Sequence, residues 1–90
     1  MSASTERLLA QECDAIKDML IAKNRAYGDS AISPVRVFSR ASAEEQILVR
    51  IDDKLSRIQR GHEHADDDTV LDLIGYLILL RVARLDTTDE

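Results

Sequence analysis

The chain has 90 residues, a formal net charge of −5, and 44% hydrophobic residues but only 3% aromatic ones. Binding to extended nucleic acid needs a basic surface, so the acidic balance argues against that function. One proline and three glycines leave little room for a β fold with many turns. We therefore expect residues 1–90 to form a single all-α domain with an aliphatic core.

The first predicted helix runs from about residue 5 to residue 23. Apolar residues recur there every three or four positions and form one stripe: Leu9, Cys13, Ile16 and Leu20. Cys13 is the only cysteine, so an internal disulfide cannot form, which fits a reducing compartment. The N-terminal residues contain no apolar stretch like that of a signal peptide. We therefore place the protein in the cytoplasm.

A long connection, residues 24–41, follows this helix, and Pro34 prevents it from continuing as a helix. Connections of this length without secondary structure are often functional. At its start, Lys23, Asn24 and Tyr27 supply a cation for phosphate, an amide and an aromatic ring, the usual parts of a nucleotide pocket. The alternative is a solvated helix end, in which the cation complements the helix dipole and the ring covers the core. Three residues are expected to hold the connection on the core: Val35, Val37 and Phe38.

The second predicted helix covers about residues 42–60. Ser42 and Glu45 have the spacing of a capping box, in which each side chain serves a free backbone N–H group of the other residue. This helix is expected to pack antiparallel to the third one, so that the protomer consists of two long antiparallel helices and an N-terminal helix. Its expected buried face consists of Ile47, Leu48, Ile51, Leu55 and Ile58.

The third predicted helix covers about residues 68–84, and its centre, residues 70–80, is apolar on nearly every side. Charged residues interrupt it, and it is shorter than the roughly 20 residues of a membrane span, so we expect no membrane partner. A helix that is apolar all round is buried on all sides, yet three helices hardly surround one of their own. We therefore expect a homodimer or a higher homo-oligomer, a helical bundle in which the second and third helices of two copies form a four-helix core.

Asp72 lies between two leucines in this apolar centre. An unpaired carboxylate there would cost on the order of several kcal/mol, so it needs a cation, a metal ion or a water-filled cleft. Asp68 and Tyr76 lie one turn before and after it on the same face. The second helix offers charged groups that share one side: Arg50, Asp53, Lys54 and Arg57.

Two interpretations of Asp72 stay open. In the first, Arg50 or Lys54 neutralises the carboxylate in a buried ion-pair network. In the second, the carboxylate belongs to a nucleotide site supported by Mg²⁺, which prefers oxygen ligands and is usually held by one or two carboxylates and substrate phosphates. The two are compatible, because an ion-pair network at the edge of a cleft can also bind phosphate.

Three segments together resemble a known family: residues 23–28 (KNRAYG), 49–57 (VRIDDKLSR) and 68–76 (DTVLDLIGY). They look like the nucleotide modification associated domain family of phages and prophages, which is similar to the MazG-like all-α nucleoside triphosphate pyrophosphohydrolases. The resemblance covers roughly residues 23–80. It implies a helical, oligomeric, nucleotide-binding protein of phage origin that works in the host cytoplasm.

In those hydrolases, carboxylate pairs on two successive helices hold Mg²⁺, which activates water to cleave a nucleoside triphosphate into a monophosphate and pyrophosphate. By position, Asp72 matches the last of these carboxylates. The resemblance thus implies Asp72 and Asp53 as catalytic residues. It implies Mg²⁺ binding by Asp53, Asp68, Asp72 and Glu45. Substrate contacts are assigned to Lys23, Asn24, Tyr27, Arg50, Lys54, Arg57 and Tyr76.

Two functions without catalysis are the alternatives. Extra cations in place of metal ligands would suit a phage protein that sequesters a nucleotide signal. An acidic helical oligomer would instead suit a protein that blocks a host defence protein.

Overall fold

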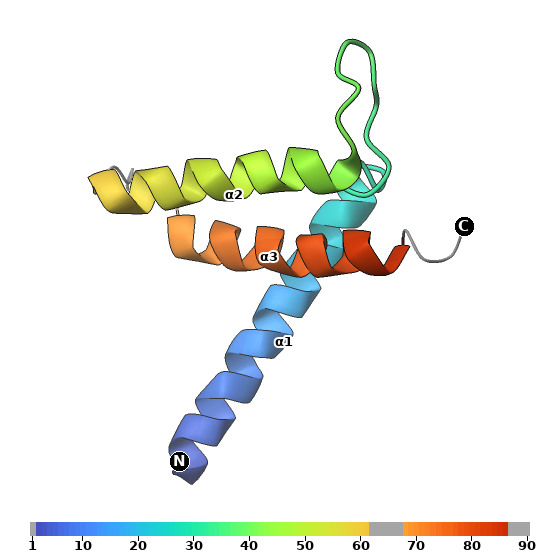
Figure 1. Cartoon of the computed structure of the whole chain (residues 1–90). Helices are drawn as coiled ribbons and strands as arrows, with labels where there is room; N and C mark the ends of the chain where they lie inside the picture. Colours follow the sequence, from blue (N-terminus) through green and yellow to red (C-terminus); the bar gives the residue numbers. More distant parts are fainter. Residues whose placement is uncertain (1, 62–67, 87–90) are drawn as a thin grey trace.

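The computed structural model of the protein describes residues 2–61 and 68–86. Within these ranges the chain forms three helices and no strand: α1 (Ala3–Ala26), α2 (Ala43–Arg60) and α3 (Thr69–Asp86) (Figure 1). The predicted all-α class with three helices is confirmed. No helix in the described part is long and apolar enough to cross a membrane.

Local side-chain and backbone contacts fix where α2 ends and where α2 and α3 begin. Ser42 Oγ accepts a hydrogen bond from the backbone N–H of Glu45 at 3.1 Å, which is the serine half of the predicted capping box. Gly61 ends α2 at φ 69°, in the left-handed region that glycine tolerates. Asp68 Oδ1 accepts from the backbone N–H of Leu71 at 2.9 Å and so caps α3.

The two helices α2 and α3 lie side by side and antiparallel (Figure 1). Ion pairs at both ends mark their register: Lys54 meets Asp72, and Glu44 meets Arg84. Between these pairs lies the aliphatic core that the composition predicts, with partly buried residues packed around it. Its buried members are Ile47, Ile51, Leu80 and Ala83.

The register corrects part of the predicted buried face of α2. Leu55 and Ile58 are 50% and 46% exposed. Because Lys54 already faces Asp72 near the start of α3, the last turns of α2 extend past the N-terminal end of α3 (Figure 1). The apolar periodicity identified the correct side of the helix but not where its partner ends.

Helix α1 crosses α3 and then projects away from the α2–α3 pair (Figure 1). At the crossing, a Cβ on Gly75 would lie 3.1 Å from Leu20 Cδ2, so the missing side chain allows the close approach. Ile16 is the buried residue of α1, whereas Leu8 and Leu9 are 56% and 50% exposed. Half of the helix therefore has no support from its own chain.

The connection between α1 and α2 does not pack on the core as predicted. Val35, Val37 and Phe38 are 81%, 73% and 96% exposed, because this segment extends away from the ends of the helices (Figure 1). Ile32 alone of its large apolar residues packs against the core cluster. A turn with positive φ at Gly28 and Asp29 directs the chain outward.

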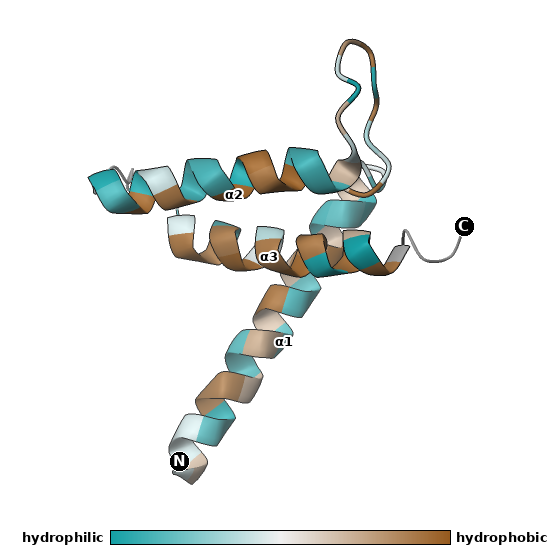
Figure 2. Ribbon diagram, viewed as in Figure 1, coloured by the Kyte–Doolittle hydropathy of each residue, from teal (hydrophilic) through white to brown (hydrophobic). Residues whose placement is uncertain are grey.

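The outer side of α3 is apolar and exposed. Brown bands cover most of this helix in Figure 2. Leu80 and Ala83 are buried against α2, but five large apolar residues are 38–67% exposed: Val70, Leu77, Ile78, Val82 and Leu85. The sequence predicts that this helix is buried on all sides, but in a single copy of the chain it is buried mainly on the side that faces α2.

Candidate functional site

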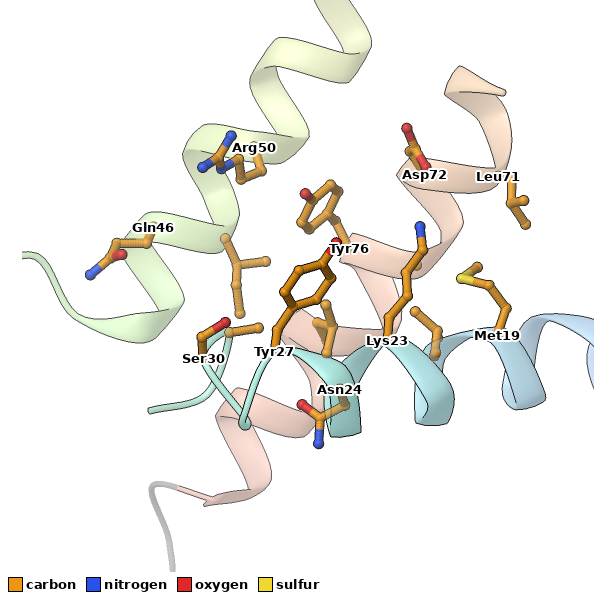
Figure 3. Close-up of a pocket in the computed structure, with 15 residues that line it drawn as sticks. Met19, Lys23, Asn24, Tyr27, Ser30, Gln46, Arg50, Leu71, Asp72 and Tyr76 are labelled. Atoms are coloured by element: carbon orange, nitrogen blue, oxygen red, sulfur yellow. The ribbon is translucent and has the colours of Figure 1, made fainter. Parts of the chain in front are cut away.

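A cavity of about 440 Å³ lies where the C-terminal half of α1 meets α2 and α3 (Figure 3). All three helices contribute side chains to its wall. Residues far apart in the sequence are thus brought together. Six residues that we predicted as substrate or metal contacts line it: Lys23, Asn24, Tyr27, Arg50, Asp72 and Tyr76.

Apolar side chains form another part of the cavity wall, among them Leu20, Leu71 and Leu79. The close approach of Leu20 to Gly75 brings α1 across α3, and this crossing brings the end of α1 to the α2–α3 pair. An apolar wall with a few polar groups is typical of small-molecule sites.

Lys23 and Arg50 give the cavity a positive character within an acidic protein. Neither forms an ion pair with another described residue, and both are exposed. In Figure 3 the Lys23 amine points toward Asp72, while Arg50 lies on the α2 wall. Asp72 is the one carboxylate among the described residues that line the cavity, so the cations there outnumber the anions.

Two tyrosines offer aromatic surface to the cavity. Tyr27 is 70% exposed, and its ring lies between Lys23 and Arg50 in the view of Figure 3. Tyr76 is half-buried and packs against the core on its other side. Asn24, in contrast, is directed away from the centre of this cavity (Figure 3), so its predicted contact with a base or sugar lacks support in this conformation.

Asp72 forms an ion pair with Lys54, whose Nζ lies 3.4 Å from Asp72 Oδ2. The Lys54 side chain is only 13% exposed and that of Asp72 is 35% exposed. The structure therefore favours Lys54 over Arg50 as the neutralising partner. Asp72 also lines the cavity, so the ion pair of the first interpretation stands at the edge of a hollow, and the Mg²⁺-supported nucleotide site of the second interpretation stays a prediction.

The four predicted magnesium ligands do not come together in the described part of one chain. Asp53 pairs with Arg57 at 3.4 Å, and Asp68 is used as the cap of α3. No three histidine, cysteine, aspartate or glutamate side chains among the described residues lie close enough to hold a metal ion. The residues present therefore do not fit a Mg²⁺ ion held by protein carboxylates alone.

The antiparallel register explains this separation. Glu44 pairs with Arg84 near the C-terminal end of α3, so the adjacent Glu45 lies several turns from Asp72. Lys54 points toward α3, and the preceding residue, Asp53, is rotated by about 100° from it around α2.

Sequence reasoning missed two polar residues of the cavity, Ser30 and Gln46. Gln46 is one helical turn before Arg50 and thus on the same face of α2, a relation that spacing alone could have revealed. Its Nε2 donates to the backbone oxygen of Ala41 at 3.0 Å and so secures the start of α2. No sequence signal marked Ser30.

Comparison with models of known protein families, with curated proteins and with solved structures finds no match for this chain. The cavity is the feature from which a function can be inferred. Its useful groups are two cations from different helices, two tyrosine rings and one carboxylate that is already paired with a lysine.

Proposed function

We propose that the protein binds a nucleotide in the cavity between α1, α2 and α3. The observation that carries this proposal is that Lys23 and Arg50 line one hollow together with the exposed ring of Tyr27. Lysine and arginine form strong charge-assisted hydrogen bonds with phosphate, and an exposed aromatic ring is a stacking surface for a base. The cavity volume of about 440 Å³ lies within the usual range for small-molecule sites.

The phosphates are assigned to Lys23 and Arg50, and the base to Tyr27. Asp72 would repel phosphate on its own, but Lys54 neutralises it at 3.4 Å. This arrangement supports binding without a metal ion. We therefore favour a protein that captures or sequesters a nucleotide.

The Mg²⁺-dependent pyrophosphohydrolase activity that the family resemblance implies stays a prediction. It would require carboxylates from outside the described part of one chain, because the predicted ligands Asp53, Asp68 and Glu45 lie away from the cavity wall. Blocking of a host defence protein also stays a prediction.

We further propose that the protein acts in the cytoplasm as a homodimer or higher homo-oligomer. Two features support self-association: the exposed apolar side of α3, and a core with only five buried hydrophobic residues among those described. The exposed free thiol of Cys13 is consistent with a reducing compartment.

Isothermal titration calorimetry of the whole protein tests the binding proposal. The titrants are nucleoside mono-, di- and triphosphates, cyclic nucleotides and dinucleotides, first with EDTA and then with Mg²⁺. We expect at least one nucleotide to bind in EDTA, with no pyrophosphate released after Mg²⁺ is added. Absence of binding to folded protein would refute the proposal. Release of pyrophosphate would show that the protein hydrolyses the nucleotide and does not merely capture it.

A pair of arginine variants locates the site. Arg50→Ala removes a cavity cation, and we expect about 10- to 100-fold weaker nucleotide binding, the equivalent of one lost charge-assisted hydrogen bond or bond pair. Arg60→Ala is the matched control on α2: it removes the same charge at an exposed position outside the cavity. Equal losses in both variants would point to general attraction by charge and not to this cavity.

A further inference from the structure

A second hollow, of about 470 Å³, lies on the other side of the crossing between α1 and α3. We call it the apolar groove. Lys17, Arg25 and Asp29 lie along it, and most of its other lining residues are aliphatic. It is lined by Ile16, Leu20 and Ile21 of α1 and by Ile74, Ile78 and Val82 of α3. Such a surface is unfavourable in water, and its chemistry suits an apolar protein segment.

The N-terminal half of α1, residues 3–15, carries part of the apolar stripe, and of its residues Cys13 alone lines the groove of its own chain. We call this half of α1 the arm. Every arm residue is exposed, including Leu9 and Cys13 of the predicted apolar stripe. The arm projects away from the α2–α3 pair (Figure 1). Helical segments of about this length are marginal in water without packing, so the arm requires a surface to cover its stripe.

We propose that two copies of this chain exchange arms, so that each arm lies antiparallel to α1 of the other copy and fills its apolar groove. One chain carries both an uncovered arm and an unfilled groove, and a second copy supplies what each of them lacks. A two-fold arrangement satisfies both needs at once and closes the assembly. This inference rests on the homo-oligomer proposed above and names the surface through which the copies meet.

The positions along α1 are self-complementary in the antiparallel direction. With the two-fold axis near Asp14 and Ala15, Leu9 of one copy lies at the level of Leu20 of the other, and Cys13 lies at the level of Ile16. These four residues share one side of the helix, since they recur at intervals of three or four. The apolar stripe of each α1 is then continuous with the groove of the other copy.

Charge also favours the antiparallel direction. The arm carries three carboxylates and one arginine, whereas the rest of α1, residues 16–26, carries three cations and one carboxylate. Antiparallel packing therefore places the acidic half of one helix beside the basic half of the other, and parallel packing would place like charges together. Such pairs chiefly determine orientation, while the apolar contacts provide the affinity.

Light scattering coupled to size-exclusion chromatography tests this proposal on the full chain. We expect the wild type to have a mass of twice 10.1 kDa or a multiple of that. Leu9→Asp should weaken association at least about tenfold, because it places a charge on the stripe that the proposed dimer buries. Leu8→Asp is the matched control: Leu8 is exposed to a similar extent, 56% against 50%, but is rotated by about 100° around α1.

Retention of the wild-type mass by Leu9→Asp, or a monomeric wild type at micromolar concentrations, would overturn the proposal. The proposal would also be overturned if Leu8→Asp dissociated the oligomer as much as Leu9→Asp does. Circular dichroism identifies a variant that has lost its helices. A folded Leu9→Asp monomer can still be tested for nucleotide binding by calorimetry, so the failure of one proposal is distinguishable from the failure of the other.

Thiol cross-linking of the wild type gives a second test that needs no variant to fold. The proposed axis places the Cys13 residues of two copies near each other, so a short bis-maleimide should produce a covalent dimer. Cys13→Ser should abolish this product. An oligomer that yields no cross-link while its Cys13 reacts freely with a single maleimide would show that the copies meet elsewhere.

Discussion

The two hollows beside α1 are nearly equal in size, about 440 and 470 Å³, but among the described residues the second is lined by more aliphatic side chains and by no tyrosine. They share lining residues at Leu20, Asn24 and Leu79. Around these shared positions, the periodicity of α1 presents Lys23 to one hollow and Ile21 to the other. A single helix crossing thus creates two hollows with different lining residues.

The difference indicates which occupant each site takes. A hollow lined by Lys23, Arg50 and two tyrosine rings suits a small soluble anion, whereas a hollow lined mostly by aliphatic side chains suits another protein segment. The first is offered by one copy of the chain. In the proposed dimer a second copy fills the other hollow, so the two proposals assign ligand capture and assembly to opposite sides of the same crossing.

The largest predicted effect comes from Gly75→Leu, which breaks both sites together. A leucine side chain would enter space held by Leu20, because even a Cβ at this position would lie 3.1 Å from Leu20 Cδ2. We expect α1 to be displaced from α3 and the free energy of unfolding to fall by about 1–3 kcal/mol. Urea denaturation, calorimetry with nucleotide and light scattering should show losses of stability, binding and association.

Gly75→Ala is the control for this prediction. Its Cβ meets only the end of a flexible side chain, and alanine favours a helix over glycine by about 1 kcal/mol. We expect the free energy of unfolding to change by less than about 1 kcal/mol, with both sites retained. If the leucine variant behaved like the alanine variant, the close approach would not be what shapes the two hollows.

The second prediction concerns Asp72→Asn, which acts on the polar cavity alone. The variant leaves Lys54, only 13% exposed, without its carboxylate partner, so unfolding should become easier by about 1–2 kcal/mol. It also removes a negative charge from the cavity wall. Calorimetry should therefore show tighter binding of an anionic nucleotide, by about fivefold, which corresponds to the Coulomb energy of about 1 kcal/mol for two unit charges about 4 Å apart in water. The oligomer mass should not change.

Asp53→Asn is the matched control, because Asp53 pairs with Arg57 outside the cavity. We expect its nucleotide affinity to equal that of the wild type. A magnesium-dependent enzyme would respond differently: both substitutions would remove predicted metal ligands and reduce turnover. Loss of nucleotide binding in both variants would therefore favour the hydrolase over simple capture.

Features that depend on neighbouring residues could be predicted from the sequence. The three helices follow from periodic apolar residues and local caps such as Ser42, which the structure shows bonded to the N–H of Glu45. The cavity residues of α3, Asp72 and Tyr76, stood out because polar groups are rare within so apolar a helix. In each case the signal lies within about one or two helical turns.

Features that depend on how the helices meet could not be predicted. The overhang of Ile58 and the distance between Glu45 and Asp72 follow from the register of α2 against α3, which involves contacts between residues far apart in the sequence. The crossing of α1 and α3 brings together Leu20 and Gly75, which lie far apart in the sequence. Apolar spacing identifies a face, but it contains no information on the length or direction of the partner.

The smallest predicted effect separates the two sites by their response to salt. Between 50 and 500 mM NaCl, screening shortens the reach of exposed charges from roughly 14 Å to roughly 4 Å. Phosphate held by Lys23 and Arg50, both exposed, should then bind several-fold more weakly in calorimetry. Dissociation of the oligomer, followed by sedimentation, should change by less than about twofold, since apolar contacts supply its affinity. Equal weakening of both would mean that the charged halves of α1 hold the copies together and that the apolar groove has another role.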